Sequence, residues 1–204
     1  MSPKDAIVPD YLGLPLGRFL DLVASREPAP GGGASAAVAV ALAAALSSMS
    51  ARFSTDHLVE APALIKRTEQ LRSEVMPLAR ADAAAYGRVL DAYGIPHNDD
   101  KEGRGRIREA LSEAASVPLF IAEIGAEVAG IAVRLVEEGN PNLRGDAVAA
   151  VELAGAGVRA AAKLVELNVS AGGADDGRLA RASELAVEAA TAQRAAESAG
   201  ARGV

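Results

Sequence analysis

The sequence predicts an all-α protein, an up-and-down helical bundle that is built around a central helix of small residues and is dimeric. Half of the 204 residues are hydrophobic but only 3% are aromatic, and such an alanine-rich composition favours close-packed helices over sheets. Residues 34–51 contain only Ala, Ser, Val, Leu and Met, so we expect them to form the central helix, buried on all sides. One short chain does not readily cover that much apolar surface, which predicts the dimer.

The first part of the chain is predicted to be irregular and then helical. Proline and glycine recur through residues 1–15 and prevent a regular helix there. Leu16, Phe19 and Val23 follow at helical spacing, which indicates a short amphipathic helix that stops before Pro28.

Residues 28–33, Pro-Ala-Pro-Gly-Gly-Gly, lead directly into the central helix. Proline fixes φ, whereas glycine permits left-handed backbone or the close approach of another group. The backbone N–H groups of Gly31, Gly32 and Gly33 would lie at the positive end of this helix, which favours an anionic or strongly polar ligand. Other interpretations are a plain turn before a core helix, a membrane span or a signal peptide. The Ala and Ser content disfavours the span, and the late start disfavours the signal peptide.

The next predicted helix covers residues 62–93, after a polar connection at residues 52–61, and it carries the main catalytic candidate. Its inward face has a three-four spacing: Leu64, Thr68, Leu71, Val75, Leu78, Asp82, Tyr86, Val89 and Tyr93. Pro77 lies inside the helix and should kink or split it. Asp82 falls on the inward face, where burial raises the pKa of a carboxyl group toward the range useful for a general acid. The alternative is a structural aspartate that caps a helix or pairs with an arginine such as Arg80 or Arg88.

The middle of the chain predicts a charged loop at residues 97–105 and then one helix with apolar positions from residue 107 to residue 135. Pro118 should kink this helix. The sequence Gly139-Asn140-Pro141 is a typical helix stop.

The last part of the chain predicts two helices. The first covers residues 146–168 and is ended by Asn168, and a loop at residues 171–177 connects it to a helix at residues 178–199. Asn140 and Asp146 lie in the turn before the first of these helices. The ordinary role of Asn and Asp at such places is turn formation and N-capping.

Composition limits the possible function and location. The length suits a single domain at residues 1–204. A formal charge of -6 and a pI near 5.1 argue against nucleic acid or an anionic membrane as partner. Cysteine is absent, and His57 and His97 are the only histidines. These counts exclude disulfides, Cys-based zinc sites and thiol catalysis and give little support to a Ser-His-Asp triad, so we expect no metal site. No targeting signal is visible, which predicts a cytoplasmic protein.

With these landmarks in place, the chain resembles the cyclodeaminase/cyclohydrolase family. This family includes the C-terminal domain of formiminotransferase-cyclodeaminase and the stand-alone methenyltetrahydrofolate cyclohydrolases. The resemblance runs from Leu16 to about Asn168. The motifs that carry it are Pro-Ala-Pro-Gly-Gly-Gly at 28–33 with the alanine-rich helix to Met49, Asp-Ala-Ala-Ala-Tyr at 82–86, Ile-Pro at 95–96, Ser-Val-Pro-Leu at 116–119, and Gly139-Asn140 with Asp146 and Asn168.

The resemblance implies an all-helical homodimer that binds a tetrahydrofolate one-carbon derivative near the subunit interface and needs no cofactor. It implies that Asp82 donates a proton to departing ammonia. The residues expected to bind the substrate are Gly31, Gly32, Gly33, Ser35, Asn140, Asp146 and Asn168. Cyclodeamination of formiminotetrahydrofolate is the first expected activity and hydrolysis of methenyltetrahydrofolate the alternative. A third possibility is a catalytically inactive helical dimer that serves as a binding or assembly protein.

The sequence also departs from the family pattern. Arg80 stands where family members often carry a second aspartate, and residues 56–58, Asp-His-Leu, replace a usual basic pair. Leu164 replaces an asparagine, and His97 replaces a lysine. These differences bear on the identity of the substrate more than on the fold. Arg52, Arg80 or Arg88 could supply the missing positive charge for the glutamate tail of the folate.

Overall fold

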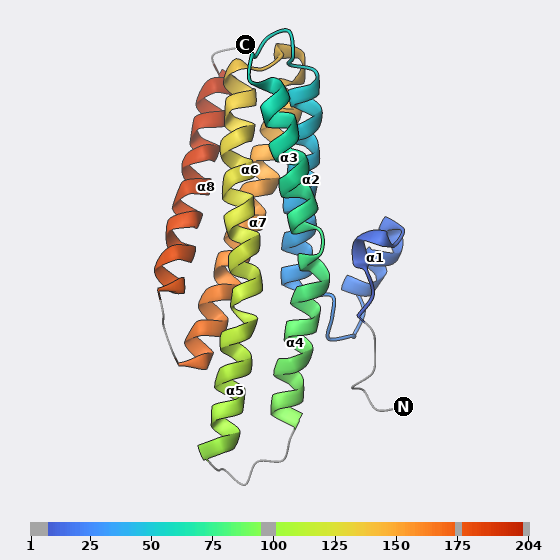
Figure 1. Cartoon of the computed structure of the whole chain (residues 1–204), viewed down its shortest axis with the longest axis vertical. Coiled ribbons are helices and arrows are strands. Elements are labelled where there is room, and N and C mark those ends of the chain that lie inside the picture. Colours follow the sequence, from blue (N-terminus) through green and yellow to red (C-terminus); the bar gives the residue numbers. More distant parts are fainter. Residues whose placement is uncertain (1–7, 95–100, 174–176, 202–204) are drawn as a thin grey trace.

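The computed structural model describes residues 8–94, 101–173 and 177–201. Within these ranges the chain is helical and contains no strand, which confirms the predicted all-α bundle. The long helices run up and down along one axis, and α1 stands to one side of them (Figure 1). In chain order the elements are η2 (Tyr11–Gly13), α1 (Leu16–Val23), α2 (Gly32–Arg52), α3 (Ala61–Val75), α4 (Leu78–Gly94), α5 (Lys101–Ala114), α6 (Ser116–Glu138), η3 (Pro141–Leu143), α7 (Arg144–Gly172) and α8 (Arg178–Ala201).

α2 is the central helix of the bundle, as predicted, and packs against α3, α4, α6 and α7. Its small side chains allow close crossings. A Cβ on Gly157 of α7 would lie 2.6 Å from Cγ2 of Val40, so α7 approaches α2 more closely than any residue but glycine allows. By length and composition α2 could cross a membrane. Its burial inside the bundle accounts for that composition.

One side of α2 is not covered, and on this point the prediction of burial on all sides is wrong. Leu42 is 51% exposed, Ala45 is also exposed, and Val38 is only partly buried. α1 adds Leu16 and Leu20, which are 65% and 57% exposed. Leu16, Val38 and Leu42 line one shallow groove, so the two apolar surfaces are continuous. The neighbouring helices of one chain surround α2 without closing over this stripe.

The helix predicted at residues 62–93 is split at Pro77 into α3 and α4, as expected from the missing backbone donor. Leu71, Val75 and Val89 are buried and confirm the predicted face. The prediction is wrong for Tyr86 and Tyr93, which are 45% and 56% exposed. This half of α4 forms, with α5, the lower end of the bundle in Figure 1, where fewer helices surround it.

The predicted helix from residue 107 to residue 135 is two helices, α5 and α6, that are separated at Ala115. Pro118 lies in the first turn of α6, so the break falls before the proline and not at it. Proline cannot donate to the carbonyl four residues earlier, which explains this position. α5 also begins at Lys101, within the loop predicted at residues 97–105. An ion pair of 3.2 Å between Glu102 and Arg106 stabilises this first turn. Residues 97–100 of the predicted loop, which include His97, lie outside the described residues.

α7 is longer than predicted and does not end at Asn168. It continues to Gly172, and Gly173 terminates it with the left-handed backbone that favours glycine, at φ 70°. The loop predicted to begin at residue 171 therefore begins at Gly173. α8 closely matches its predicted range.

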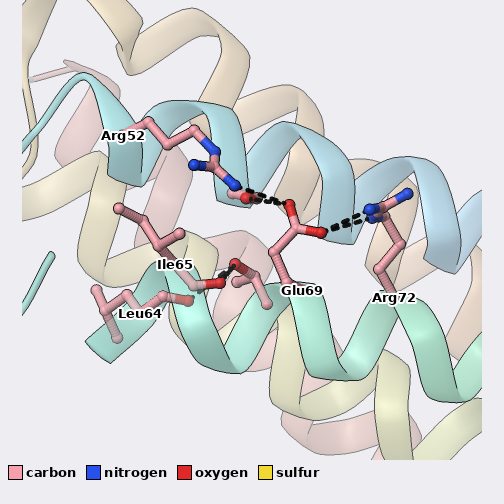
Figure 2. Close-up of polar contacts among 7 residues, drawn as sticks. Arg52, Leu64, Ile65, Glu69 and Arg72 are labelled. Carbon is pink, nitrogen blue, oxygen red and sulfur yellow. Dashed lines mark hydrogen bonds and ion pairs between the residues drawn. The ribbon is translucent and has the colours of Figure 1, made fainter. Parts of the chain in front are cut away.

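A polar cluster fastens α3 to the C-terminal half of α2 (Figure 2). Glu69 of α3 accepts a hydrogen bond of 2.7 Å from the Ser48 hydroxyl and two, of 3.1 and 2.6 Å, from Arg72. Arg52 of α2 adds a longer contact of 3.4 Å. These donors lower the pKa of Glu69 from its ordinary 4.5 to about 2, with Arg72 the largest cause. The ionised carboxylate therefore stabilises the fold.

We expect Glu69→Gln to lower the free energy of unfolding by about 1 kcal/mol near neutral pH, because the charged groups are partly exposed and screened by solvent. The folded pKa is depressed, so the contribution is present above pH 4.5 and is lost as the pH falls toward about 2. Urea unfolding of both proteins across this range measures the difference. Glu74→Gln is the control, because Glu74 on the same helix makes only a 3.4 Å contact with Arg67. A difference that persists unchanged at pH 2 would contradict the assignment.

Candidate active site

Asp82 of α4 lies against the N-terminus of α2. The N-cap residue of α2, Gly31, has no side chain to cap the free N–H groups of the first turn. Asp82 does this from another helix, because its carboxylate accepts a hydrogen bond from the backbone N–H of Ala34. A Cβ on Gly33 would overlap the Asp82 carboxyl group, with all three of its atoms closer than 3.0 Å. Only glycine at this position lets the carboxylate reach the helix end.

Partial burial shifts the pKa of Asp82. Desolvation raises the pKa of this carboxyl group, and the hydrogen bond from Ala34 offsets the rise only in part. Burial also raises the pKa of Tyr11, and the nearby charge of Asp82 adds to that rise. Within the described part of the chain Asp82 has no ion pair, and Arg88 instead contacts Glu113 at 3.6 Å. The geometry therefore supports the inward Asp82 predicted from the spacing and disfavours pairing with Arg88. The other structural alternative, a helix-capping aspartate, describes the contact that Asp82 makes with the first turn of α2.

A cavity of about 280 Å³ opens beside Asp82. Its walls come from the turn before α2, from α4 and from α7, and the lining residues are Pro28, Ala29, Gly31, Gly32, Gly33, Asp82, Ala83, Tyr86 and Leu164. Gly32 faces Leu164, because a Cβ at Gly32 would lie 3.7 Å from Cδ1 of that leucine. The structure thus brings together Asp82 and the three glycines predicted for the site. None of the three has a positive φ, and only Gly33 is required by a close approach, because a Cβ at Gly31 would meet nothing within 4 Å and one at Gly32 would make an ordinary contact.

A second cavity of about 470 Å³ adjoins the first. The two share Pro28, Ala29, Ala83 and Tyr86 as walls. Tyr11 lines the larger cavity, and Glu27 and Asp91 also lie on it. The sequence prediction did not include Tyr86 or Tyr11 as site residues. For Tyr86 the signal was its position four residues after Asp82, which places both side chains on one face of α4.

Two of the other predicted site residues are near this region, but their side chains make hydrogen bonds to backbone carbonyls. The Ser35 hydroxyl donates to the backbone carbonyl of Gly31 at 2.9 Å, within the first turn of α2. The Asn168 amide donates to the carbonyl of Ala114 at 3.2 Å. That carbonyl is the one that Pro118 leaves without a helical donor, so Asn168 compensates the break between α5 and α6.

Asn140 and Asp146 lie near the C-terminal end of α2, whereas Asp82 contacts its N-terminal end. The length of α2 therefore separates them from Asp82 of the same chain by about 30 Å. The Asn140 backbone N–H donates to Ser54 Oγ, and its amide donates to the carbonyl of Phe53, both at 2.9 Å. Asp146 lies in the first turn of α7. Asn140 therefore has the turn-forming role that the sequence offered as its ordinary use, and one chain does not bring either residue to the cavity.

The positive charges suggested for a glutamate tail do not line either cavity. Arg52 belongs to the Glu69 cluster, and Arg88 contacts Glu113. Arg80 is exposed on α4 and is absent from both cavity walls. Among the residues that the structure describes, no lysine or arginine lines the cavities.

Comparison with known proteins identifies the family of this chain. The family model described as formiminotransferase-cyclodeaminase matches residues 15–189. The chain belongs to this family. A methenyltetrahydrofolate cyclohydrolase of Methylorubrum extorquens is 37% identical over 167 residues, which cover 78% of this chain and 79% of the relative.

The cyclodeaminase family also supplies a longer relative and a solved structure. The formimidoyltransferase-cyclodeaminase of Rattus norvegicus is 32% identical over 176 residues, and these cover 77% of this chain but only 32% of the rat protein. The crystal structure of formiminotetrahydrofolate cyclodeaminase from Thermotoga maritima superposes with a TM-score of 0.82 at 28% identity. That superposition covers 92% of this chain and 96% of the other, so the cyclodeaminase fold extends over nearly all of it.

Proposed function

We propose that the protein is a folate one-carbon enzyme that converts formiminotetrahydrofolate to 5,10-methenyltetrahydrofolate and ammonia. The observation that carries the proposal is the partly buried Asp82 carboxyl group on the wall of a cavity, held against the end of α2 by a backbone hydrogen bond. Membership in the cyclodeaminase family and the activities named for the relatives support folate as the substrate.

In this reaction N10 of the folate attacks the formimino carbon on N5, and the N10 proton moves to the formimino nitrogen. The new C–N bond closes a five-membered ring around a tetrahedral carbon. The bond to the amino nitrogen then breaks while that nitrogen takes a proton from Asp82 and leaves as ammonia. The methenyl bridge keeps the positive charge. A carboxyl group whose pKa is raised by burial keeps this proton at higher pH than an exposed one.

Hydrolysis of methenyltetrahydrofolate is the second candidate. It is favoured by the 37% identity to a methenyltetrahydrofolate cyclohydrolase, which covers 78% of this chain and 79% of the relative. Here a water molecule attacks the methenyl carbon, and the ionised Asp82 accepts the water proton. The bond from this carbon to N5 then breaks, N5 takes a proton as the hydroxyl group gives one up, and the carbon stays on N10 as a formyl group. The same carboxyl group serves both reactions in opposite protonation states. Neither reaction requires a metal or a cofactor besides the folate.

Assays of the purified protein with formiminotetrahydrofolate and with methenyltetrahydrofolate decide between these activities. Cyclodeamination makes the methenyl chromophore appear and releases ammonia, whereas hydrolysis makes the chromophore disappear without ammonia. A protein that binds tetrahydrofolate derivatives but turns over neither would be the inactive binding protein considered from the sequence. A protein that neither binds nor converts any of them would refute the proposal.

We also propose that the active form is a cytoplasmic homodimer. The uncovered stripe of α2 around Leu42 and the exposed leucines of α1 form a continuous apolar surface, and a second copy of the chain would cover it. Sedimentation at micromolar concentration should give twice the chain mass of 20.7 kDa. A single-chain mass at that concentration would contradict the dimer.

A further inference from the structure

We infer that the larger cavity, lined by Tyr86, Glu27 and Asp91, receives the pterin head of the folate, with the Tyr86 ring stacked on it. The inference rests on the proposed folate substrate. It assigns a ligand role to Tyr86 and an orientation to the folate.

The arrangement of Asp82 and Tyr86 fits the chemistry of the substrate. The reacting carbon of a folate lies between two ring systems, the pterin and the aminobenzoyl group. Tyr86 follows Asp82 by one helical turn, a rise of about 6 Å, so a ligand held at Asp82 brings one of its ring systems to Tyr86. Tyr86 is half exposed and forms part of both cavity walls. Its ring is therefore available to stack on a flat ligand where the cavities meet.

The size and lining of the larger cavity suit a heterocycle. Its volume of about 470 Å³ exceeds that of the cavity at Asp82. Apolar side chains, among them Val8, Leu22 and Leu90, form most of its wall, and polar groups lie at only a few points. Sites for small molecules commonly combine apolar walls with a small number of polar groups.

The charge of this cavity selects the pterin and not the tail of the folate. Glu27 and Asp91 are the charged residues on its wall, and no lysine or arginine in the described ranges accompanies them. The pterin edge presents N3–H and a 2-amino group side by side, a pair of donors that a carboxylate accepts much as it accepts an arginine. The glutamate tail carries carboxylates, which the two acidic residues would repel. The tail must therefore leave the site in another direction.

Measuring the binding of 5-formyltetrahydrofolate, a stable analogue of the substrate, by calorimetry tests whether Tyr86 stacks on the pterin. Tyr86→Leu should weaken binding about tenfold, because stacking of one base on an aromatic ring contributes that much. Tyr86→Phe keeps the ring and should bind nearly as the wild type does. Tyr93→Leu is the matched control, since Tyr93 lies on the same exposed part of α4 but lines neither cavity. Thermal unfolding of each variant checks that the fold is kept.

The double variant Glu27→Gln with Asp91→Asn tests the orientation, because the two possible orientations give opposite results. With the pterin in this cavity the double variant should bind the analogue more weakly. Tighter or unchanged binding would overturn the orientation, since removing the charges relieves repulsion of a tail. Wild-type affinity in Tyr86→Leu would overturn the stacking while leaving the proposed function intact. Absence of folate binding and turnover in the wild type would overturn both.

Discussion

Asp82→Asn should lower kcat/KM by about a hundredfold to ten-thousandfold, the usual cost of losing a general acid or base. The fold should survive, because the asparagine oxygen can still accept the hydrogen bond from Ala34 and asparagine caps helices well. The transferable proton is what the substitution removes. Steady-state rates with each folate, together with thermal unfolding, measure the two effects separately.

The pH dependence of the wild type gives a further readout of the same residue. If Asp82 donates the proton, the rate of cyclodeamination should fall as the pH rises through its raised pKa. Asp82→Ala serves as the comparison, because it loses both the proton and the cap and should also lose about 1 kcal/mol of stability. Full turnover in Asp82→Asn would show that the residue is neither acid nor base. Unfolding of Asp82→Asn would instead make it a structural cap.

Local spacing was sufficient to predict most of the helices and the inward position of Asp82. The three-four pattern around Leu71 and Val75 defines a helix face whatever it packs against, and Pro77 breaks a helix wherever it occurs. The exposure of Tyr86 and Leu42 was not predictable in this way. It depends on which helices surround a given side, and the sequence pattern of one helix does not contain that information.

The sequence predicted only part of the candidate site, because the rest depends on contacts between helices. The glycines at the start of α2 and the inward carboxylate of Asp82 were each recognisable, but their contact joins distant segments of the chain and only the fold shows it. Asn168 and Asn140 matched family positions, yet their hydrogen bonds go to the carbonyls of Ala114 and Phe53. The need for a donor at Ala114 follows from Pro118, but nothing in the sequence says which side chain supplies it.

Gly33→Ala should abolish most activity while changing stability little. The added methyl group would occupy the space of the Asp82 carboxyl group, which is the end of a flexible side chain and would swing away from α2. The proton donor then leaves its position, so kcat should fall about as far as in Asp82→Asn. The lost cap costs on the order of 1 kcal/mol, and the better helix propensity of alanine offsets part of it. Rates and urea unfolding of the variant check both statements.

Two other alanine substitutions separate the displacement of Asp82 from a smaller cavity and from a change in helix propensity. Gly32→Ala places its methyl group at an ordinary contact distance of 3.7 Å from Leu164, inside the cavity, so it should raise KM and leave kcat and stability nearly unchanged. Gly130→Ala in α6 meets nothing within 4 Å and controls for helix propensity alone. Wild-type kcat in Gly33→Ala would mean that the carboxylate acts from some other position, and that its contact with the end of α2 serves the fold and not the reaction.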